Sequence, residues 1–256
     1  MKIGILKCDE RMEIVSKLLN RYEVFFISNY YELVDKGKDL NCIVLGFNNF
    51  DEDKIVFDNL KLTYAEFKKL LPDNIKLIVP RNNKYLENNF SSIYAYYYDK
   101  KVVMENSELT SEGVIHYLIG NIDISIKDLK IDIIGYGNCG RSLATWLNDL
   151  NVENRVIRRS VYSNIKNFMT IEEWKNGKIN KVIVNTADYP IIDDNMLNEM
   201  KDVLIVDIAS NSQINSALAN KNNKYVLLKG IPNIISKYSA AKIISDYIER
   251  VNDNEG

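Results

Sequence analysis

The stretch KIDIIGYGNCGRSLATWL, residues 130–147, decides the fold of the C-terminal half of this chain. A strand-like run of β-branched residues ends at Ile134, three glycines follow with G-x-G-x-x-G spacing, and a helical pattern of apolar residues begins directly after them. This order of strand, glycine turn and helix is the context that raises the motif above a chance match. It predicts a Rossmann unit, a fold built to bind a dinucleotide.

Each part of the turn has an expected task. Gly135 allows the tight turn, Gly137 lets the backbone approach a pyrophosphate, and Gly140 lets the helix pack closely on its strand. The phosphates would meet the N–H groups of Asn138 and Cys139 and the positive end of the helix dipole. The alternative is a close-packed turn that holds no ligand.

The next strand indicates which dinucleotide is preferred. NAD-binding folds place an acidic residue roughly 20 residues after the glycine motif, at the end of the second strand. There it accepts hydrogen bonds from the ribose hydroxyls of the adenosine. This strand instead ends with Arg158, Arg159 and Ser160, which suit the additional phosphate of NADP. We therefore predict NADP as the cofactor; a solvated basic strand end is the alternative.

Short apolar runs alternate with helical patterns along the rest of the chain, which is typical of βα units around parallel sheets. The predicted strands of the first half are 2–6, 23–27, 42–46, 75–79 and 93–98. Those of the second half are 130–134, 154–158, 181–185, 203–208 and 224–228. The fold class is α/β, with two open parallel-sheet domains of which the C-terminal one is the Rossmann fold.

Helical patterns set the domain boundaries. We expect an N-terminal domain over 1–104, a connecting helix over 105–121, the Rossmann domain over 122–232, and a helix over 233–256 that packs back on the N-terminal domain. The opening turn KCDER at 7–11 lacks glycine, so it cannot hold a pyrophosphate in the same way. One cofactor per chain follows, with the N-terminal domain contributing substrate contacts.

Composition excludes several classes of protein. Lys and Arg total 33 against 35 Asp and Glu, which gives no positive field to attract nucleic acid or a membrane surface. The apolar runs are strand-sized, and charges near the N-terminus argue against a signal peptide, so we expect a cytoplasmic protein. A single histidine and three scattered cysteines predict no metal site.

The region around the glycine turn resembles a known family. NSELTSEGVIHYLIGNIDISIKDLKIDIIGYGNCGRSLA, from Asn106 to Ala144, is similar to the linker and Rossmann entry of the dipicolinate synthase A subunit, with its pattern N-S-x-x-T-x-E-G. The resemblance implies an NADP-dependent oxidoreductase that works with a flavoprotein-like B subunit. Its substrate would be a 4-hydroxy-tetrahydrodipicolinate, a small dicarboxylate, and its product the dipicolinate of bacterial spores.

The dicarboxylate needs two anion-binding positions. We expect the first at the start of the connecting helix, where free N–H groups and hydroxyls could hold a carboxylate, and the second at Arg11 after the first strand. The candidates on the helix are Asn106, Ser107, Thr110 and Glu112. Plain helix capping is the alternative for the first three, and for Glu112 the alternative is an acid of the first turn that the helix dipole favours.

Polar residues at the carboxyl ends of later strands complete the expected site. Asn185, Thr186 and Asp207 are candidates for the cofactor. Ser210 is the candidate contact to substrate or nicotinamide, and Lys237 and Tyr238 could supply an anion partner or a proton donor.

The chain departs from the family directly after Ser210. Residues 211–214 read NSQI, where the family continues with a proline and paired glycines. Two alternatives therefore stay open: a dinucleotide-sensing regulatory module without turnover, and a two-domain dehydrogenase of another amino or hydroxy acid. The sequence leaves the oligomeric state open, a homo-oligomer included.

Overall fold

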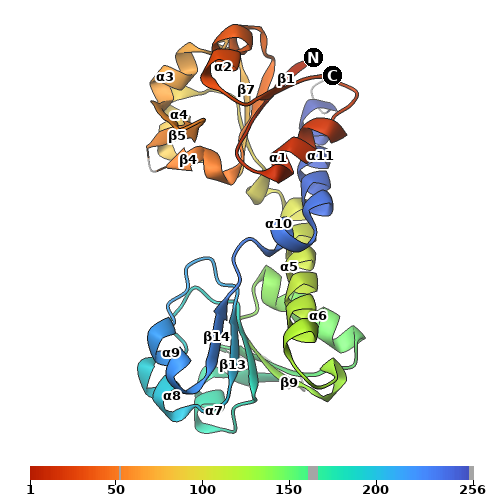
Figure 1. Cartoon of the computed structure of the whole chain (residues 1–256), viewed down its shortest axis with the longest axis vertical. Helices are drawn as coiled ribbons and strands as arrows, with labels where there is room; N and C mark the ends of the chain where they lie inside the picture. The colour runs from red at the N-terminus through yellow and green to blue at the C-terminus, as the bar shows by residue number, and fades with distance from the viewer. Residues whose placement is uncertain (52, 161–166, 254–256) are drawn as a thin grey trace. The chain divides into compact units, whose positions relative to one another are not determined.

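The computed structural model describes residues 1–51, 53–160 and 167–253. The chain divides into two compact units, one formed by Met1–Asn106 together with Ser236–Gly256 and the other by Ser107–Ile235. Each unit is an α/β fold built on a parallel sheet with helices packed against it (Figure 1). The predicted fold class is confirmed.

The N-terminal unit has a five-stranded sheet in the order β2-β1-β3-β7-β8, with all neighbours parallel. Its strands are β1 (Lys2–Leu6), β2 (Glu23–Ile27), β3 (Cys42–Val44), β7 (Lys76–Val79) and β8 (Ile93–Ala95). All five predicted strands are present. The last is shorter than predicted, because Tyr96–Tyr98 turn into a 3-10 helix.

A three-stranded antiparallel sheet that the sequence pattern did not predict follows β3. It consists of β4 (Phe50–Asp51), β5 (Lys54–Phe57) and β6 (Leu60–Thr63). The two residues between β5 and β6, Asp58 and Asn59, have φ values of 49° and 61°, the left-handed backbone of a tight hairpin turn. Ile55 and Phe57 of β5 are buried in the core of this unit.

Side-chain caps mark the helices of this unit. Asp9, Asn29, Thr63 and Asn83 accept hydrogen bonds from backbone N–H groups in the first turn of the helix that each precedes. The helices are α1 (Glu10–Leu18), α2 (Tyr30–Lys36), α3 (Tyr64–Lys69) and α4 (Lys84–Asn89).

The C-terminal helix packs on this unit, as predicted. α11 (Lys237–Asp253) contacts α1, and Arg21 pairs with Glu249 and Asp253. The single helix expected from 233 is wrong in one respect, because α10 (Ile231–Ile235) ends before α11 begins. Ser236 lies between them, and its carbonyl accepts the N–H of Ala240 in the first turn of α11.

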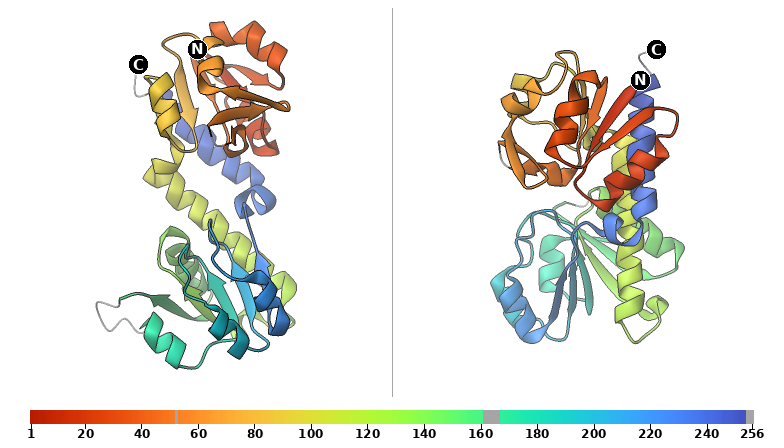
Figure 2. Two further views of the ribbon diagram at one scale, coloured as in Figure 1. Left: turned by 90° about the vertical axis from the view of Figure 1, so that its left-hand side faces the viewer. Right: turned by 45° about the horizontal axis from the view of Figure 1, so that its top comes forward.

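The C-terminal unit has six parallel strands in the order β11-β10-β9-β12-β13-β14. They are β9 (Lys130–Ile134), β10 (Glu153–Arg158), β11 (Phe168–Thr170), β12 (Val182–Asn185), β13 (Leu204–Asp207) and β14 (Lys224–Leu227). When the six strands of this unit are numbered 1 to 6 in chain order, their order across the sheet is 3-2-1-4-5-6, which is the Rossmann arrangement. The short edge strand β11 was not predicted. The sheet is visible from two further directions in Figure 2.

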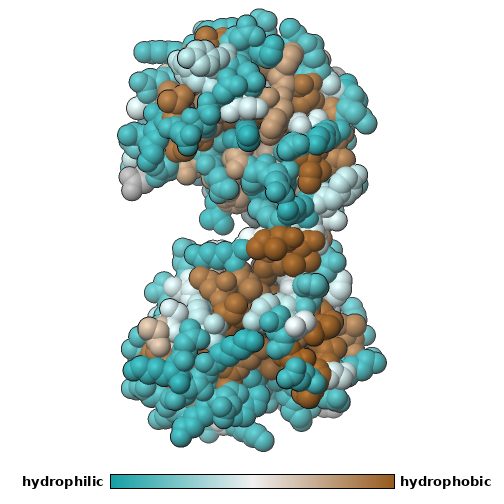
Figure 3. Space-filling view, viewed as in Figure 1, coloured by the Kyte–Doolittle hydropathy of each residue, from teal (hydrophilic) through white to brown (hydrophobic). Residues whose placement is uncertain are grey.

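Helices cover this sheet and bury its central strands. Besides α10 they are α6 (Asn138–Asp149), α7 (Ile171–Asn176), α8 (Asp194–Glu199) and α9 (Ser216–Asn222). Two apolar clusters pack on the sheet, and Trp174 of α7 is fully buried in one of them. Hydrophilic residues cover most of the visible face of each unit, although apolar residues also gather on the C-terminal one (Figure 3).

The connecting helix α5 (Lys100–Asn121) begins five residues earlier than predicted. The carboxylate of Asp99 accepts the N–H of Val102, which places the cap at Asp99. Asn106, Ser107, Thr110 and Glu112 therefore lie inside the helix, where their N–H groups bond to the preceding turn. The predicted anion site at free N–H groups of these residues is wrong. No helix in the described part of the chain could span a membrane.

Candidate functional site

The glycine turn lies at the carboxyl end of β9, where the order of the sheet reverses between β10 and β12. Gly135 has a φ of 99°, and a Cβ atom there would lie 2.7 Å from Oγ1 of Thr186. The Thr186 hydroxyl donates to the carbonyl of Ile134 at 2.9 Å, which fixes the end of the strand. Position 135 therefore requires glycine, and Thr186 supports the turn.

Gly140 brings the helix against the turn. A Cβ atom at this position would lie 2.3 Å from the carbonyl oxygen of Gly135, which is backbone and cannot move aside. The close approach of α6 to the end of β9 thus depends on two glycines in contact. This is the packing role predicted from the motif.

Gly137 differs from the other two. It precedes α6 with an ordinary extended backbone, φ −74° and ψ −163°, and a Cβ atom would meet nothing within 4 Å. Gly137, the N-cap residue, has no side chain to cap α6, and among the described residues the space where its Cβ would lie, beside the amino end of this twelve-residue helix, is open. Since the fold itself does not need glycine here, the space next to Gly137 and the N–H groups of Asn138 and Cys139 suits an anionic group.

A pocket of about 290 Å³ adjoins this turn. Its lining includes Gly135, Tyr136, Arg158, Arg159, Ser160 and Tyr189. The basic strand end predicted to read a phosphate thus opens into the same cavity as the glycine turn. The pocket combines cationic, hydroxyl and aromatic groups, and none of the described residues that line it is acidic.

Aromatic rings of this pocket contact three arginines, of which Arg158 and Arg159 line the pocket and Arg141 does not. The guanidinium of Arg159 lies 4.5 Å from the ring centre of Tyr189, and those of Arg141 and Arg158 lie 5.5 Å and 5.8 Å from Tyr136. These separations are those of cation–π contacts. Sequence reasoning missed Tyr136, Arg141 and Tyr189, because only Tyr136 belongs to the motif and it occupies one of its unspecified positions.

Asn185 and Asp207, predicted to contact the cofactor, bond to one another in this structure. Asn185 Nδ2 donates to Asp207 at 3.0 Å, and the carboxylate also accepts the N–H of Ala209 and the hydroxyls of Ser212 and Tyr225. Asp207 has no exposed surface. Its task in this structure is to hold the segment that follows β13.

Ser210 lies on that segment, exposed beside a cavity of about 560 Å³. The N–H of Asn211 bonds to Asp188 at 2.9 Å, and the N–H of Ile214 bonds to Ser212 Oγ at 3.2 Å. Asp188 therefore holds the NSQI segment at Asn211, and Asp207 holds it at Ser212, to which the N–H of Ile214 is bonded within the segment. These bonds give Ser210 a defined position at the carboxyl edge of β13.

Ser107 and Thr110 face the glycine helix. Both are more than nine-tenths buried, and Ser107 Oγ lies 3.8 Å from Cys139 Sγ. One turn further, Ser111 Oγ bonds to Ser142 Oγ of α6 at 2.9 Å. Burial raises the pKa of the Cys139 thiol, and its hydrogen bonds with Ser107 and Thr110 oppose that rise. These hydroxyls pack α5 against the first turn of α6.

The other predicted substrate residues lie elsewhere. Asn106 accepts the hydroxyl of Tyr97 at 3.3 Å in the N-terminal unit, and Glu112 is half-buried within α5. Lys237 pairs with Glu10, whereas the ring of Tyr238 is largely exposed. Both lie at the start of α11.

Arg11, the predicted anchor for the second carboxylate, is buried with few partners for its charge. It is 4% exposed in the first turn of α1, just after β1, and Nη2 donates to Asp9 at 3.3 Å. Its Nε is buried and has no hydrogen-bond partner among the residues that the structure describes. A buried guanidinium with one long hydrogen bond is costly to the fold, which favours a role in holding an anion.

Metal and thiol chemistry receive no support from the described residues. Among them no group of three or more His, Cys, Asp or Glu side chains could hold a metal ion. Burial raises the pKa of Cys8 and of Cys42 to about 12, which keeps both thiols protonated near neutral pH.

Comparison with known proteins places this fold. No protein-family model and no curated protein matches the sequence. Two structures of the dipicolinate synthase A subunit are similar: that of Bacillus halodurans (TM-score 0.82, 20% identity, 98% of this chain and 97% of the other) and that of Bacillus subtilis (TM-score 0.83, 20% identity, 99% and 96%). The NAD-dependent formate dehydrogenase of Staphylococcus aureus, in complex with NAD, is similar at a TM-score of 0.57 and 14% identity over 100% and 97%.

These likenesses establish a shared two-domain fold. The resemblance to the dipicolinate synthase A subunit expected from the sequence is confirmed in the structure, over nearly the full length of both chains.

Proposed function

We propose that this chain is an NADP-dependent oxidoreductase of the same kind as the A subunit of dipicolinate synthase. The observation that carries the proposal is the arrangement around Gly137. An uncapped helix end with unfilled space opens next to a pocket lined by Arg158, Arg159 and Ser160. A dinucleotide with an additional phosphate matches both features at once.

The residues of the C-terminal unit divide the work of holding this cofactor. Gly135 and Gly140 shape the turn, and the N–H groups of Asn138 and Cys139 would bind the pyrophosphate. Arg158, Arg159 and Ser160 would bind the 2′-phosphate by charge-assisted hydrogen bonds. The nicotinamide, once bound, supplies the hydride acceptor.

The proposed reaction forms an aromatic dicarboxylate from a 4-hydroxy-tetrahydrodipicolinate, with a B subunit acting as the partner. It removes one water and transfers one hydride to the nicotinamide, with release of one proton. Arg11 would hold one carboxylate, because its buried charge is poorly paired within the fold. Ser210, Lys237 and Tyr238 remain the proposed groups for orienting the substrate or moving protons.

A titration followed by a turnover assay tests this function. Calorimetry should show saturable binding of NADP, with NAD weaker. The 4-hydroxy-tetrahydrodipicolinate is then added together with a dipicolinate synthase B subunit. This mixture should produce reduced cofactor and dipicolinate at the same time. Absence of saturable binding of either nucleotide to folded protein would overturn the proposal.

The anchored segment after β13 favours a second candidate, a module that binds the dinucleotide and regulates a partner without turnover. The bonds of Asp207 and Asp188 restrain residues 208–214, where the family has glycines. NADP binding without reduction on any tested dicarboxylate, amino acid or hydroxy acid would favour this module. Turnover of an amino or hydroxy acid alone would instead indicate another two-domain dehydrogenase.

A further inference from the structure

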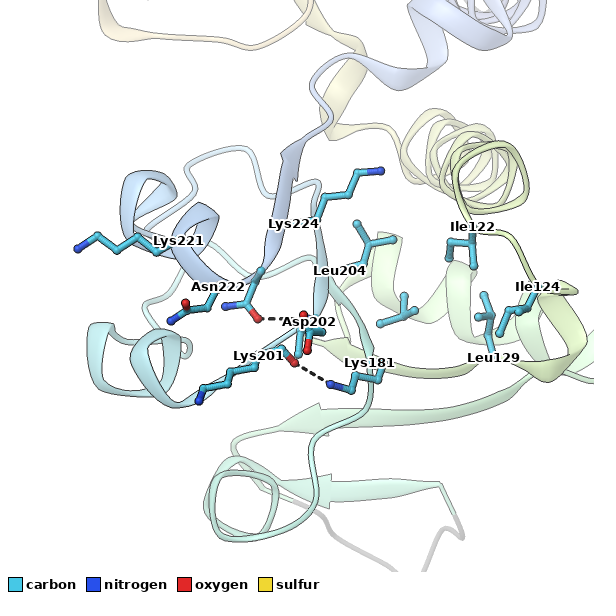
Figure 4. Close-up of a pocket in the computed structure, with 13 residues that line it drawn as sticks. Ile122, Ile124, Leu129, Lys181, Lys201, Asp202, Leu204, Lys221, Asn222 and Lys224 are labelled. Carbon is cyan, nitrogen blue, oxygen red and sulfur yellow. Dashed lines mark hydrogen bonds between the residues drawn. The ribbon is translucent and has the colours of Figure 1, made fainter.

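A second cavity lies in the C-terminal unit, at the amino ends of the strands and therefore on the opposite edge of the sheet from the glycine turn. Its volume is about 690 Å³. Leu129 precedes β9, Lys181 precedes β12, and residues 201–203 precede β13. The end of α9 and the start of β14 complete one side, and Ile122 and Ile124, directly after α5, complete the other (Figure 4).

Uncompensated positive charge surrounds this cavity. Lys181, Lys201, Lys221 and Lys224 line it together with a single acidic residue, Asp202. None of the four lysines forms an ion pair with any residue in the described ranges of the chain. Other lysines of the same unit do, as Lys130 does with Glu153 at 2.7 Å and Lys175 with Asp193 at 2.6 Å.

An apolar wall faces these lysines. Ile124 is 56% exposed, although it is a large aliphatic side chain, and Ile122, Leu129 and Leu204 continue the apolar surface beside it. In Figure 4 the isoleucines and Leu129 lie together on one side, and the side chain of Lys224 extends from β14 above Leu204. The cavity thus has one apolar side and one basic side.

We propose that this cavity is a docking site for an acidic polypeptide segment that inserts an apolar side chain against Ile124. Charge complementarity selects the acidic partner, since the local charge is strongly positive in a chain of net charge −2. The exposed isoleucine and its neighbours supply the apolar contact.

The directions of the lysines distinguish a polypeptide from a small anion. In Figure 4 the side chains of Lys201 and Lys221 both extend outward to the left, away from the isoleucines and Leu129, and Lys181 donates to the carbonyl of Lys201 at 2.7 Å. One compact anion beside the isoleucines would not reach the outward ammonium groups of Lys201 and Lys221. An extended segment with several carboxylates can reach them in succession, as a solvated rim around an apolar anchor.

Two labelled peptides of about twelve residues test the site, one built of glutamate and leucine and the other of lysine and leucine. Fluorescence anisotropy should show saturable binding of the acidic peptide to the full chain and none of the basic peptide. Raising salt from about 50 to 300 mM should weaken binding at least about 10-fold. Absence of saturable binding of the acidic peptide overturns the proposal.

Variants locate the binding. Lys201→Glu together with Lys221→Glu should weaken the acidic peptide at least about 10-fold, and Ile124→Ser about 5-fold. The matched control, Lys69→Glu together with Lys178→Glu, carries the same charge change at exposed lysines outside the cavity and should stay within about 2-fold. Equal losses in both double variants would show that only overall charge matters and would overturn the site.

A competition with citrate distinguishes a site for a polypeptide from a site for a small anion. Displacement of the peptide by citrate at submillimolar concentration would show that the cavity takes a small anion, against the proposal. NADP binding should be unchanged in the cavity variants, because the glycine turn lies at the other edge of the sheet. The peptide result therefore does not depend on whether the chain binds a dinucleotide.

Discussion

The guanidinium of Arg159 lies directly over the ring of Tyr189, with 4.5 Å between its central carbon and the ring centre. The two residues follow different strands, β10 and β12, and only the fold brings them together, at one pocket beside the glycine turn. The ring restricts the rotamers of a long side chain, which lowers the entropy that a phosphate contact has to overcome. Arg159 is thus preorganised for an anion.

Replacing the arginines should separate the two nucleotides. Arg158→Ala together with Arg159→Ala should weaken NADP about 100-fold, because two charge-assisted contacts to the 2′-phosphate are lost, and NAD less than about 3-fold. Calorimetric titration with each nucleotide measures both constants. Equal losses for NADP and NAD would show that the strand end does not read the phosphate.

Tyr189 should act through Arg159. Tyr189→Leu removes the ring and should weaken NADP about 5-fold, whereas Tyr189→Phe keeps the ring and should bind NADP as the unaltered chain does. The same titrations serve as the measurement. If phenylalanine and leucine gave the same loss, the hydroxyl of Tyr189 would matter rather than its π-face.

Gly137 offers a test in which binding is separated from folding. Gly137→Leu fills the space beside the helix end and should weaken NADP at least about 100-fold. Apart from its chain neighbours, no described residue has an atom within 4 Å of a Cβ there, so the variant should cost at most about 1 kcal/mol of stability at this capping position. Thermal unfolding and titration together measure the two effects.

Gly120→Ala is the matched control for that variant. Gly120 lies inside α5, a Cβ atom there also meets nothing within 4 Å, and alanine should stabilise the helix by about 0.5–1 kcal/mol without any effect on NADP. Undiminished NADP binding by Gly137→Leu would exclude the turn as the pyrophosphate site.

Long periodic segments and the glycine motif were predictable from the sequence because both depend on local residue order. The strands around Ile134 and Val184 and the helix after Gly140 lie where their patterns place them. The β5–β6 hairpin was missed although Asp58 and Asn59 suit its turn, because neither residue is the glycine that usually marks such turns.

The start of α5 and the environment of Asp207 could not be predicted in this way. A polar run from Asn106 suggests a cap, but the apolar packing of Val102 and the carboxylate of Asp99 extend the helix toward its N-terminus. Asp207 carries the sequence signature of a ligand contact, and only the fold shows that neighbouring polar groups surround it. The contact of Tyr189 with Arg159 likewise depends on chain segments far apart in sequence.

Asp132 provides a stability prediction for the Rossmann unit. Its carboxylate is fully buried and accepts two hydrogen bonds from Arg155, both at 2.8 Å, as well as the indole N–H of Trp174 and two N–H groups of Asn180. Asp132→Ala removes the acceptor that these donors share, although Arg155 keeps its bond to the carbonyl of Lys178, and should lower the free energy of unfolding by about 3–5 kcal/mol.

Denaturant unfolding measures that loss. The exposed pair of Lys130 with Glu153 lies on the two strands β9 and β10 and is the natural control, since Glu153→Ala should change stability by less than about 1 kcal/mol. A loss at Asp132 no larger than that of Glu153→Ala would show that the network is not a structural support.

The pair of Asp99 and Arg250 predicts a pH dependence in the N-terminal unit. Arg250 donates to both carboxylate oxygens at 3.0 Å and 3.1 Å and thereby holds the pKa of Asp99 below its ordinary value. A lowered folded-state pKa stabilises the fold above the pKa of the unfolded chain, and this contribution is lost as the pH falls through the folded-state pKa. The stability difference between the unaltered chain and Asp99→Asn should therefore shrink between about pH 5 and pH 2.

Thermal unfolding over that pH range gives the measurement. Glu13→Gln is the control. Lys17 also lowers the pKa of the Glu13 carboxyl, but this pair is exposed to solvent. The variant should therefore show no measurable change in stability at any pH. A constant difference for Asp99→Asn down to about pH 2 would exclude the carboxylate charge as the cause.

Arg11→Met shows whether Arg11 is needed for the stability of the fold or for binding of the dicarboxylate. The variant replaces a buried guanidinium, bonded to Asp9 at 3.3 Å and with Nε unpartnered, by an apolar side chain. Because a poorly paired buried charge costs desolvation energy, the free energy of unfolding should stay equal or rise by about 1–2 kcal/mol.

If Arg11 holds a substrate carboxylate, affinity for the dicarboxylate should fall about 100-fold in Arg11→Met while NADP binding is unchanged. Arg11→Lys, which keeps the charge and loses the planar fork, should recover little of that affinity. Loss of stability together with unchanged dicarboxylate binding would make Arg11 a structural residue.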